Sequence, residues 1–286
     1  MSVVTRFAPS PTGKLHLGHA FSSLLVYNST KKNNGKFLLR IEDLDFQRCR
    51  REFEESIFED LNWLGIKWDK KPIRQSQRFN LYTDVIKTLW KKGVAYKCEC
   101  TRKDISKAFQ NFDENQSLPP DIYPGTCRPK SINHNNFSVR LDIRKAIELI
   151  DIKDLFFFNK TEINTPFEKI NISPETLIRD FGDVVIARKD IKTSYHIAVV
   201  VDDSAQKISQ VTRGYDLFKS TFFHVLLQKL LNFKTPKYMH HKILYDNHGK
   251  KLSKRIGSTS LETFRNSGSK KEDLFKLLNL NQNVWS

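Results

Sequence analysis

Two histidines near the start of the chain and two lysines near its end have the types and spacing needed to act on phosphate. His16 and His19 lie three residues apart, so at a helix start both imidazoles can face one side, where unpaired backbone N–H groups favour anions. Gly18 between them leaves room for a base or ribose. In the downstream basic loop, Lys251 and Lys254 can neutralise charge that builds on triphosphate oxygens. Together the two segments predict a nucleotide phosphate site.

The elements expected in the first hundred residues can position such a site. Residues 3–7 and 37–41 resemble short buried strands, and between them apolar residues recur at three-to-four spacing until Gly35, which indicates a helix. A strand, helix and strand in this order are typical of a parallel α/β unit. Two further helices are expected over residues 50–64 and 77–92, each followed by a glycine.

The sequence becomes irregular after residue 95. Irregular sequence over residues 96–180 holds three of the four cysteines and predicts a module inserted into a core that spans residues 1–95 and 181–232. Where the core resumes, we expect three β-rich segments, at residues 183–187, 195–201 and 208–212, and then a helix at residues 216–231. Residues 233–286 form a C-terminal region that carries the basic loop and short helical pieces.

Composition narrows the class of protein. The 286 residues include 48 Lys plus Arg against 32 Asp plus Glu, a formal charge of +16 that favours a polyanionic partner, although a lysine-rich composition of the source would give the same excess. The chain has no run of 18 apolar residues and no signal peptide, so a soluble, cytoplasmic protein that makes no use of membrane is expected. Four unevenly spaced cysteines do not form a disulfide framework.

The run Arg6-Phe7-Ala8-Pro9-Ser10-Pro11-Thr12-Gly13 before His16, together with the lysine loop, resembles the two signatures of class I aminoacyl-tRNA synthetases. Further stretches are similar to the catalytic domain of glutamyl-tRNA synthetases, namely residues 40–45, 63–66, 75–78, 200–203 and 213–216. The resemblance covers nearly all of the chain. It implies an α/β, Rossmann-like catalytic core of a ligase that uses Mg²⁺ with ATP and L-glutamate.

The resemblance also assigns roles to the two signatures. It implies ATP binding by His16, Gly18, His19 and Lys254, and catalysis by His16, His19, Lys251 and Lys254 through stabilisation of charge on the phosphates.

Length distinguishes two branches of this family. Only 31 residues (286 minus 255) follow Arg255, where a full glutamyl-tRNA synthetase carries a large helical anticodon-binding region. The short form resembles the glutamyl-queuosine tRNA(Asp) synthetases, which implies a stem-contact-like C-terminal region, no anticodon-binding domain, and transfer of glutamate to the queuosine base of tRNA(Asp). Two alternatives stay open: a minimal glutamyl-tRNA synthetase that charges a tRNA 3′ end, and a non-catalytic tRNA-binding paralogue.

A pocket for glutamate needs one acidic group for the ammonium and a basic or hydroxyl-rich end for the side chain. Arg6, Glu42, Tyr195 and Arg213 supply that set. By similarity to the family, Glu42 holds the α-ammonium, the two arginines and the tyrosine hold the side-chain carboxylate, and the stretch Phe7, Ala8, Pro9 and Ser10 completes the pocket. Glutamine should be rejected, because its neutral amide would leave a buried guanidinium unpaired.

The cysteines of the inserted module predict a structural zinc site of an acceptor-type module. Cys98, Cys100 and Cys127 lie within 30 residues (127 minus 98, plus one). The resemblance places a tyrosine, here Tyr123, as fourth ligand, and its phenol, with an ordinary pKa of about 10, would lose its proton to the metal. His134 is the conventional alternative to Tyr123 as fourth ligand. The simplest alternative to a zinc site is three buried or free thiols without a metal.

Overall fold

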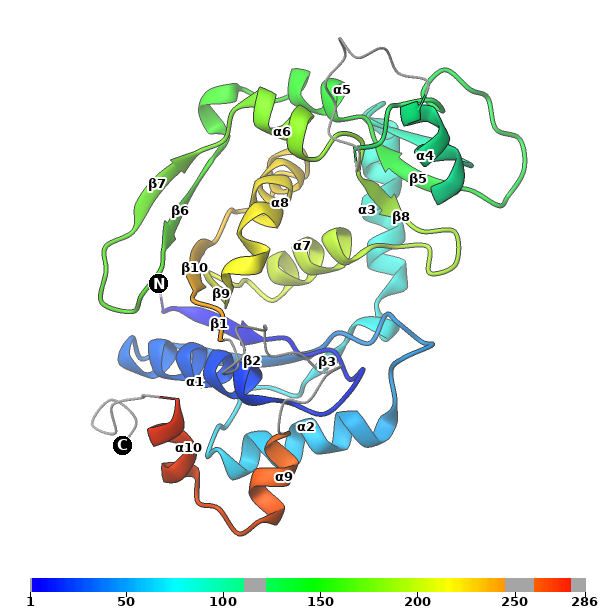
Figure 1. The fold of residues 1–286 in the computed structure, drawn as a ribbon. Coiled ribbons are helices and arrows are strands. Elements are labelled where there is room, and N and C mark those ends of the chain that lie inside the picture. Colours follow the sequence, from blue (N-terminus) through cyan, green and yellow to red (C-terminus); the bar gives the residue numbers. More distant parts are fainter. Residues whose placement is uncertain (1, 111–121, 245–259, 279–286) are drawn as a thin grey trace.

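The computed structural model describes residues 2–110, 122–244 and 260–278 (Figure 1). The expected strand–helix–strand unit is confirmed: β1 (Val4–Phe7) and β2 (Lys36–Ile41) pair in parallel and are joined by α1 (Leu17–Lys32). Both strands are mostly buried and apolar, as is usual for parallel sheets covered on both faces. At Gly35 a side chain would overlap the carbonyl oxygen of Val3, so only glycine fits where the chain enters β2.

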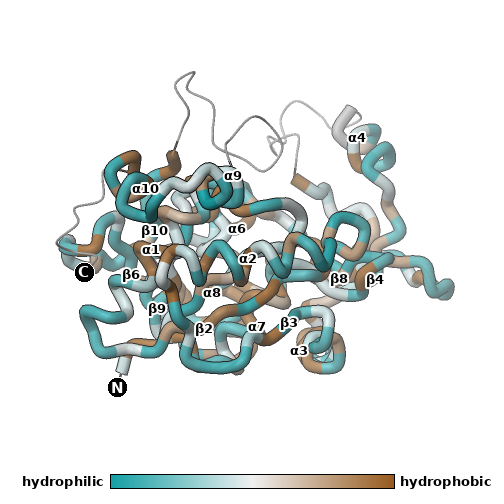
Figure 2. The backbone as a smooth tube through the Cα atoms, turned by 90° about the horizontal axis from the view of Figure 1, so that it is seen from below, coloured by the Kyte–Doolittle hydropathy of each residue, from teal (hydrophilic) through white to brown (hydrophobic). Residues whose placement is uncertain are grey.

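The central sheet continues on both sides of β1. The short strand β3 (Ile73–Arg74) pairs with β2, while on the other side the Ser209 amide donates to the Val4 carbonyl at 2.9 Å and leads into β9 (Gln210–Gly214). Next to β9 come β10 (Lys237–His241) and β6 (Phe156–Lys160), both parallel, and then the antiparallel edge strand β7 (Glu168–Asn171). In Figure 2, β2 is coloured as hydrophobic and runs through the middle of the molecule.

Most expected helices are confirmed. They are α2 (Arg51–Trp63), α3 (Phe79–Lys91) after the 3-10 turn η1 (Gln75–Gln77), and α8 (Phe218–Leu230) after the 3-10 turn η3 (Tyr215–Leu217). The glycines that follow α2 and α3, Gly65 and Gly93, have φ values of 76° and 74°, the left-handed conformation that ends a helix.

The expected β segment at residues 195–201 is wrong, because these residues begin the helix α7 (Tyr195–Ala205). Residues Ile197 to Val201 are all buried, and a helix buried on every side has the same continuous apolar sequence as a buried strand. The distinguishing signal is Ser194, whose side chain accepts from the Ile197 amide as an N-cap.

A second, smaller sheet is antiparallel and consists of β4 (Ala95–Cys98), β5 (Ser138–Leu141) and β8 (Val185–Ala187). The helices near it are α4 (Arg102–Gln110), α5 (Ile143–Glu148) and α6 (Pro174–Asp180), with a 3-10 turn η2 (Ile152–Asp154). The range expected as an insertion therefore also contributes the hairpin β6–β7 to the central sheet, beside β10.

The C-terminal helices α9 (Leu261–Asn266) and α10 (Lys271–Leu277) lie below α1 and α2 in Figure 1. Arg265 of α9 forms an ion pair with Glu59 of α2 at 2.8 Å, which fixes this region to the N-terminal half. None of the helices in the described parts of the chain is long and apolar enough to cross a membrane.

Candidate active site

The carboxyl ends of four parallel strands, β1, β2, β9 and β10, face one cleft of about 460 Å³. The chain runs from β1 to β2 on one side, whereas β9 and β10 lie on the other side of β1, so the strand order reverses at β1. An open α/β sheet binds its ligands at such a point. Nine of the expected site residues line this cleft: Phe7, Ala8, Pro9, Ser10, His16, Gly18, His19, Glu42 and Arg213.

The two histidines cap the N-terminus of α1 with their own side chains. His16 Nδ1 accepts from the Gly18 amide at 3.1 Å, and His19 Nδ1 accepts from the His16 amide at 3.2 Å. A neutral imidazole that accepts at Nδ1 carries its proton on Nε2, so each ring can donate from Nε2 to a phosphate oxygen. A side chain at Gly18 would come within 2.9 Å of His16 Cε1, so this glycine makes room for the His16 ring.

The chain returns to the same place after the basic loop. Ser260 forms an antiparallel bridge with His16, the Leu261 amide donates to the Leu15 carbonyl at 2.9 Å, and Lys14 forms an ion pair with Glu262. Leu244, at the other flank of this segment, lines the cleft. Lys251 and Lys254 themselves lie outside the described residues.

At the amino-acid end of the cleft, Arg213 and Tyr195 lie together, with Nη1 at 3.5 Å from the tyrosine Oη. Arg6 is directed elsewhere, because its Nε and Nη2 donate to the two carboxylate oxygens of Asp203 at 3.0 and 3.3 Å. Arg6 and Tyr195 are not among the described residues that line the cleft. Of the two arginines expected to hold a carboxylate, Arg213 lines the cleft, whereas Arg6 already forms an ion pair with Asp203.

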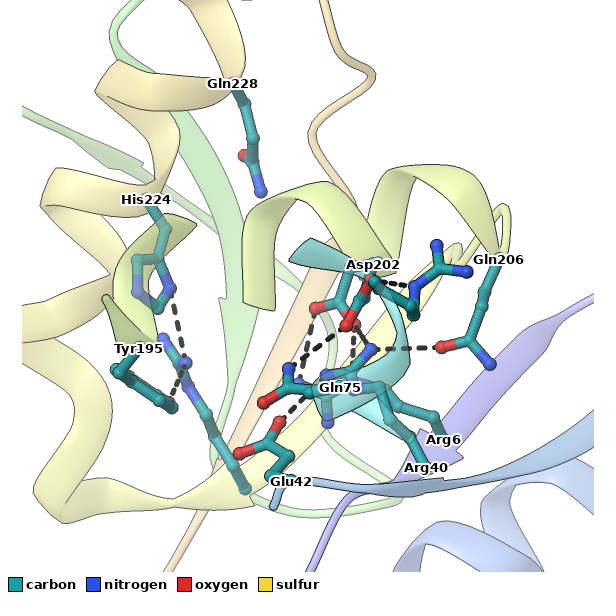
Figure 3. Close-up of polar contacts among 12 residues, drawn as sticks. Arg6, Arg40, Glu42, Gln75, Tyr195, Asp202, Gln206, His224 and Gln228 are labelled. Carbon is teal, nitrogen blue, oxygen red and sulfur yellow. Dashed lines mark hydrogen bonds and ion pairs between the residues drawn. The ribbon is translucent and has the colours of Figure 1, made fainter. Parts of the chain in front are cut away.

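Arg40 and Asp203 are site residues to which sequence reasoning gave no role. Arg40 is fully buried, and it donates from Nη1 to Asp203 Oδ1 at 2.7 Å and from Nη2 to Glu42 Oε1 at 3.1 Å (Figure 3). Both residues belong to stretches that resemble the family, residues 40–45 and 200–203, so their positions were visible although their pairing was not. The pair fixes the carboxylate of Glu42 at the cleft wall.

The environment shifts the pKa of both carboxylates in this group. Burial raises the pKa of Glu42 above its ordinary value, and the charges of Arg40 and Arg6 oppose that rise only in part. Burial also acts on Asp203, but there the charges of Arg6 and Arg40 outweigh it and hold the pKa below its usual range. Asp203 is therefore a permanent anion, whereas Glu42 is easier to protonate.

The three expected metal-ligand cysteines lie together in the smaller sheet and the loop that faces it. The Sγ atoms of Cys98, Cys100 and Cys127 are within 4.8 Å of one another, and the Tyr123 hydroxyl is 3.4 Å from Cys98 Sγ and 3.5 Å from Cys100 Sγ. His134 points elsewhere, with its Nε2 at 3.3 Å from Glu99 Oε2 on the exposed surface. Of the two candidates for a fourth ligand, Tyr123 is the one that faces the thiols.

The environment favours the thiolate of Cys127 in this cysteine cluster, whereas burial raises the pKa of Cys100. Burial acts to raise the pKa of Cys127, but hydrogen bonds from the Tyr123 hydroxyl and the backbone outweigh it and lower that pKa to about 7. Arg140 Nε donates to Cys98 Sγ at 3.2 Å, and its Cζ lies 3.7 Å from the Tyr123 ring centre. Such a donor set of soft sulfurs and one oxygen fits a zinc ion.

Comparison with known proteins identifies the family of the chain. A glutamyl-Q tRNA(Asp) synthetase from Rhodobacter capsulatus is 41% identical over 295 residues, which cover 97% of this chain and 100% of that protein. A glutamate–tRNA ligase from Aquifex aeolicus is 38% identical over 96% of this chain, but the chain spans only 56% of that protein.

A solved structure agrees with the sequence matches. The crystal structure of a glutamate tRNA ligase from Elizabethkingia meningosepticum in complex with its amino acid aligns with a TM-score of 0.69 at 28% identity, over 94% of this chain and 53% of that one. The sequence pattern of the family described as tRNA synthetases class I (E and Q), catalytic domain, matches residues 2–282. Together with the histidine-capped cleft at the ends of the parallel strands, this match establishes that the chain belongs to the class I tRNA synthetases (E and Q).

Proposed function

We propose that this protein is a ligase that activates L-glutamate with Mg-ATP and transfers it to the queuosine base of tRNA(Asp). The observation that carries the proposal is that one cleft brings together the His16 and His19 cap, the Glu42 carboxylate and the Arg213 guanidinium. A phosphate site and an amino-acid site thereby share one cavity, which is what adenylate formation needs.

In the first step, an oxygen of the glutamate α-carboxylate attacks the α-phosphorus of ATP, and the bond from that phosphorus to the bridging oxygen of pyrophosphate breaks. His16 and His19 donate to phosphate oxygens from Nε2, and the α1 N-terminus adds its own partial positive charge. Lys251 and Lys254 are proposed to close from the opposite side, a role supported by the two flanks of their segment at Leu244 and Ser260. Magnesium would accompany ATP and would neutralise part of the negative charge on its phosphates.

Substrate recognition follows from the charges at the other end of the cleft. Glu42 is proposed to hold the α-ammonium, and Arg213 with Tyr195 the side-chain carboxylate, while residues Phe7 to Ser10 form the wall between them. Arg6 takes a supporting part, since its guanidinium is held by Asp203.

In the second step, a hydroxyl of the RNA acceptor attacks the carbonyl carbon of glutamyl adenylate, an ester bond forms, and AMP leaves. Queuosine in tRNA(Asp) is proposed as the acceptor because the Rhodobacter relative carries that specificity in its name and matches over its whole length. The charge of +16 supports an RNA partner. Two ranges are proposed to contact it, apart from the strands β6, β7 and β10 that belong to the central sheet: residues 96–180 as an acceptor-type module and residues 233–286 as a stem-contact-like region.

A structural zinc ion is proposed for the module, held by Cys98, Cys100, Tyr123 and Cys127. The three sulfurs lie within 4.8 Å of one another and the Tyr123 hydroxyl lies 3.4 and 3.5 Å from two of them, so the four donors are close enough to hold one ion. When bound, the ion would cross-link β4 to the segment at residues 123–127 and take no part in the reaction.

Two assays test the proposed function. Purified protein should catalyse glutamate-dependent exchange of pyrophosphate into ATP without any tRNA, and glutamine should not replace glutamate. Labelled glutamate should then transfer to tRNA(Asp) that contains queuosine and not to the same tRNA without it. Transfer to a 3′-terminal adenosine would instead favour a minimal glutamyl-tRNA synthetase, and a folded protein without exchange activity would indicate a non-catalytic tRNA-binding paralogue.

A further inference from the structure

The guanidinium of Arg213 is enclosed by four neutral hydrogen-bonding side chains, Tyr195, Thr221, His224 and His240, which we call the Arg213 cage. Its Nη2 donates to Thr221 Oγ1 at 2.8 Å, and its Nε donates to His240 Nε2 at 3.3 Å. Its Nη1 lies 3.4 Å from His224 Nδ1 and 3.5 Å from Tyr195 Oη; Figure 3 draws these last two contacts. Every group that accepts a hydrogen bond from Arg213 in the cage is therefore uncharged.

This arrangement differs from that of the neighbouring buried arginines. Arg6 pairs with Asp203, and Arg40 pairs with both Asp203 and Glu42. In the parts of the chain that the structure describes, no carboxylate forms an ion pair with Arg213. A buried guanidinium held only by neutral acceptors keeps its charge for a ligand, which explains chemically why a carboxylate would be preferred over an amide.

The cage requires one particular tautomer of His240. Arginine can only donate, and the Thr221 hydroxyl, 3.0 Å from the same nitrogen, can donate as well, so the His240 Nε2 that faces Arg213 Nε is the unprotonated nitrogen. The proton of the neutral ring then lies on Nδ1, which is 2.6 Å from Asn159 Oδ1, an acceptor. Burial and then the positive charge of Arg213 lower the pKa of His240 to about 3, so the ring stays neutral near pH 7.

The other histidine of the cage follows the same logic. His224 accepts from Arg213 at Nδ1, so its proton lies on Nε2, which is 3.0 Å from His196 Nδ1. Burial lowers the pKa of His224 well below its ordinary value, and the charge of Arg213 adds to that effect. Two independent contacts behind the cage therefore fix the proton positions that Arg213 needs.

We propose that Asn159 is a positioning residue for the amino-acid pocket: by accepting from His240 Nδ1, it keeps His240 Nε2 as an acceptor and so holds Arg213 in place for the ligand carboxylate. Asn159 lies on β6, in the range expected as the inserted module; it does not line the cleft, and it is not among the hydrogen-bond partners of Arg213 in the described residues. The inference rests on the proposed function, in which Arg213 binds the side-chain carboxylate of glutamate.

The test compares Asn159→Leu with Gln210→Leu in glutamate-dependent pyrophosphate exchange. Gln210 is a buried amide on the same strand as Arg213, but its side chain donates to Ser29 at 3.0 Å and lies outside the cage. Asn159→Leu should raise the KM for glutamate at least tenfold and leave the KM for ATP within twofold of the wild type. Gln210→Leu should leave both within twofold. An unchanged glutamate KM in Asn159→Leu, or an equal rise in both variants, overturns the inference.

A second variant, Asn159→Asp, keeps an acceptor and adds a signature that a purely structural role would not produce. The negative charge of the new carboxylate would stabilise the doubly protonated, cationic form of His240. The proton on its Nε2 would then face the Nε–H of Arg213, and the hydrogen bond between the two side chains would be lost. The other charged or titratable groups near His240 are Arg213 of β9, Arg6 of β1, His224 of α8, and Tyr238 and His241 of its own strand.

The ratio of the Asn159→Asp to the wild-type glutamate KM should be near one at pH 8.5 and should rise severalfold toward pH 6. A ratio that stays constant overturns the inference even if Asn159→Leu fails to fold. Active wild-type protein with either negative result contradicts this inference alone, whereas inactive, folded wild-type protein contradicts the proposed function itself.

Discussion

At the scale of single residues, the cleft combines a carboxylate held by an arginine, Glu42, with a guanidinium held by neutral side chains, Arg213. Arg6 and Arg40 share the carboxylate of Asp203, and Arg40 also pairs with Glu42, so two cations balance two anions and fix the position of Glu42. Glu42 and Arg213 line the cleft with opposite charges. A zwitterionic amino acid with an acidic side chain is the ligand that such a pair would complement.

The raised pKa of Glu42 predicts a pH dependence of substrate binding. As pH falls, Glu42 takes up a proton earlier than an ordinary glutamate and loses the charge that attracts the α-ammonium. We expect the KM for glutamate in pyrophosphate exchange to rise between pH 8 and pH 5.5, while the KM for ATP changes less. Glu42→Gln should raise the glutamate KM at all pH values and abolish this dependence. A dependence that persists unchanged in Glu42→Gln would show that another group titrates.

At the scale of elements, the sequence predicted α1 but not α7, and the reason is physical. The α1 region carries helix punctuation at both ends, with the H-x-G-H start and the glycine at residue 35, so the helix is visible without tertiary context. The run Ile197 to Val201 of α7 is continuously apolar, so its periodicity does not separate helix from strand, and the one local signal is the Ser194 N-cap. Similarly, cleft residues Phe7 to Ser10 follow from local motifs, whereas the pairing of Arg40 with Asp203 spans 163 positions.

The cysteine cluster gives a prediction at the same scale. Purified protein should contain one zinc ion per chain by elemental analysis, and chelation should lower its thermal unfolding midpoint, because the ion would cross-link β4 to residues 123–127. Cys127→Ser should lose the metal. The matched control is Cys49→Ser, a free cysteine outside the cluster, which should keep it.

Further variants distinguish the fourth ligand. Tyr123→Phe should weaken zinc retention against a competing chelator, whereas His134→Asn should not, because His134 faces Glu99 on the surface. Zinc loss in His134→Asn with full retention in Tyr123→Phe would reverse the assignment.

At the scale of the whole molecule, two segments far apart in sequence, residues 14–16 and 260–262, lie together beside the cleft. The bridge between His16 and Ser260 and the ion pair between Lys14 and Glu262 hold the region after the basic loop against the segment that opens α1. The lysines and the histidines can therefore act on one set of phosphates although more than 230 positions separate them in sequence.

Lys254→Ala tests this long-range arrangement. If the lysine stabilises charge that develops as pyrophosphate leaves, the variant should lower kcat for exchange by about a hundredfold or more and change the glutamate KM little. Lys70→Ala, a lysine at the surface far from the cleft lining, serves as the control and should behave as the wild type. Equal loss of glutamate binding and exchange would contradict the assigned role.

The buried histidines behind Arg213 also make global stability depend on pH. Burial first, and then the charge of Arg213, lowers the pKa of His196 to about 4, and His224 and His240 are shifted in the same direction, whereas unfolded histidines titrate near about 6.5. Between these values the unfolded chain binds more protons than the folded one, so the stability present above pH 6.5 is lost as pH falls toward 4. Each histidine contributes a slope of at most about 1.4 kcal/mol per pH unit.

The measurement is the free energy of unfolding in urea from pH 7 to pH 5. The wild-type value should fall, and His196→Asn should give a shallower fall because one buried titrating group is removed. His134→Asn, which changes an exposed histidine, should keep the wild-type slope. A slope in His196→Asn as steep as that of the wild type would mean that His196 binds protons equally in the folded and unfolded chain, and that the loss of stability comes from other groups.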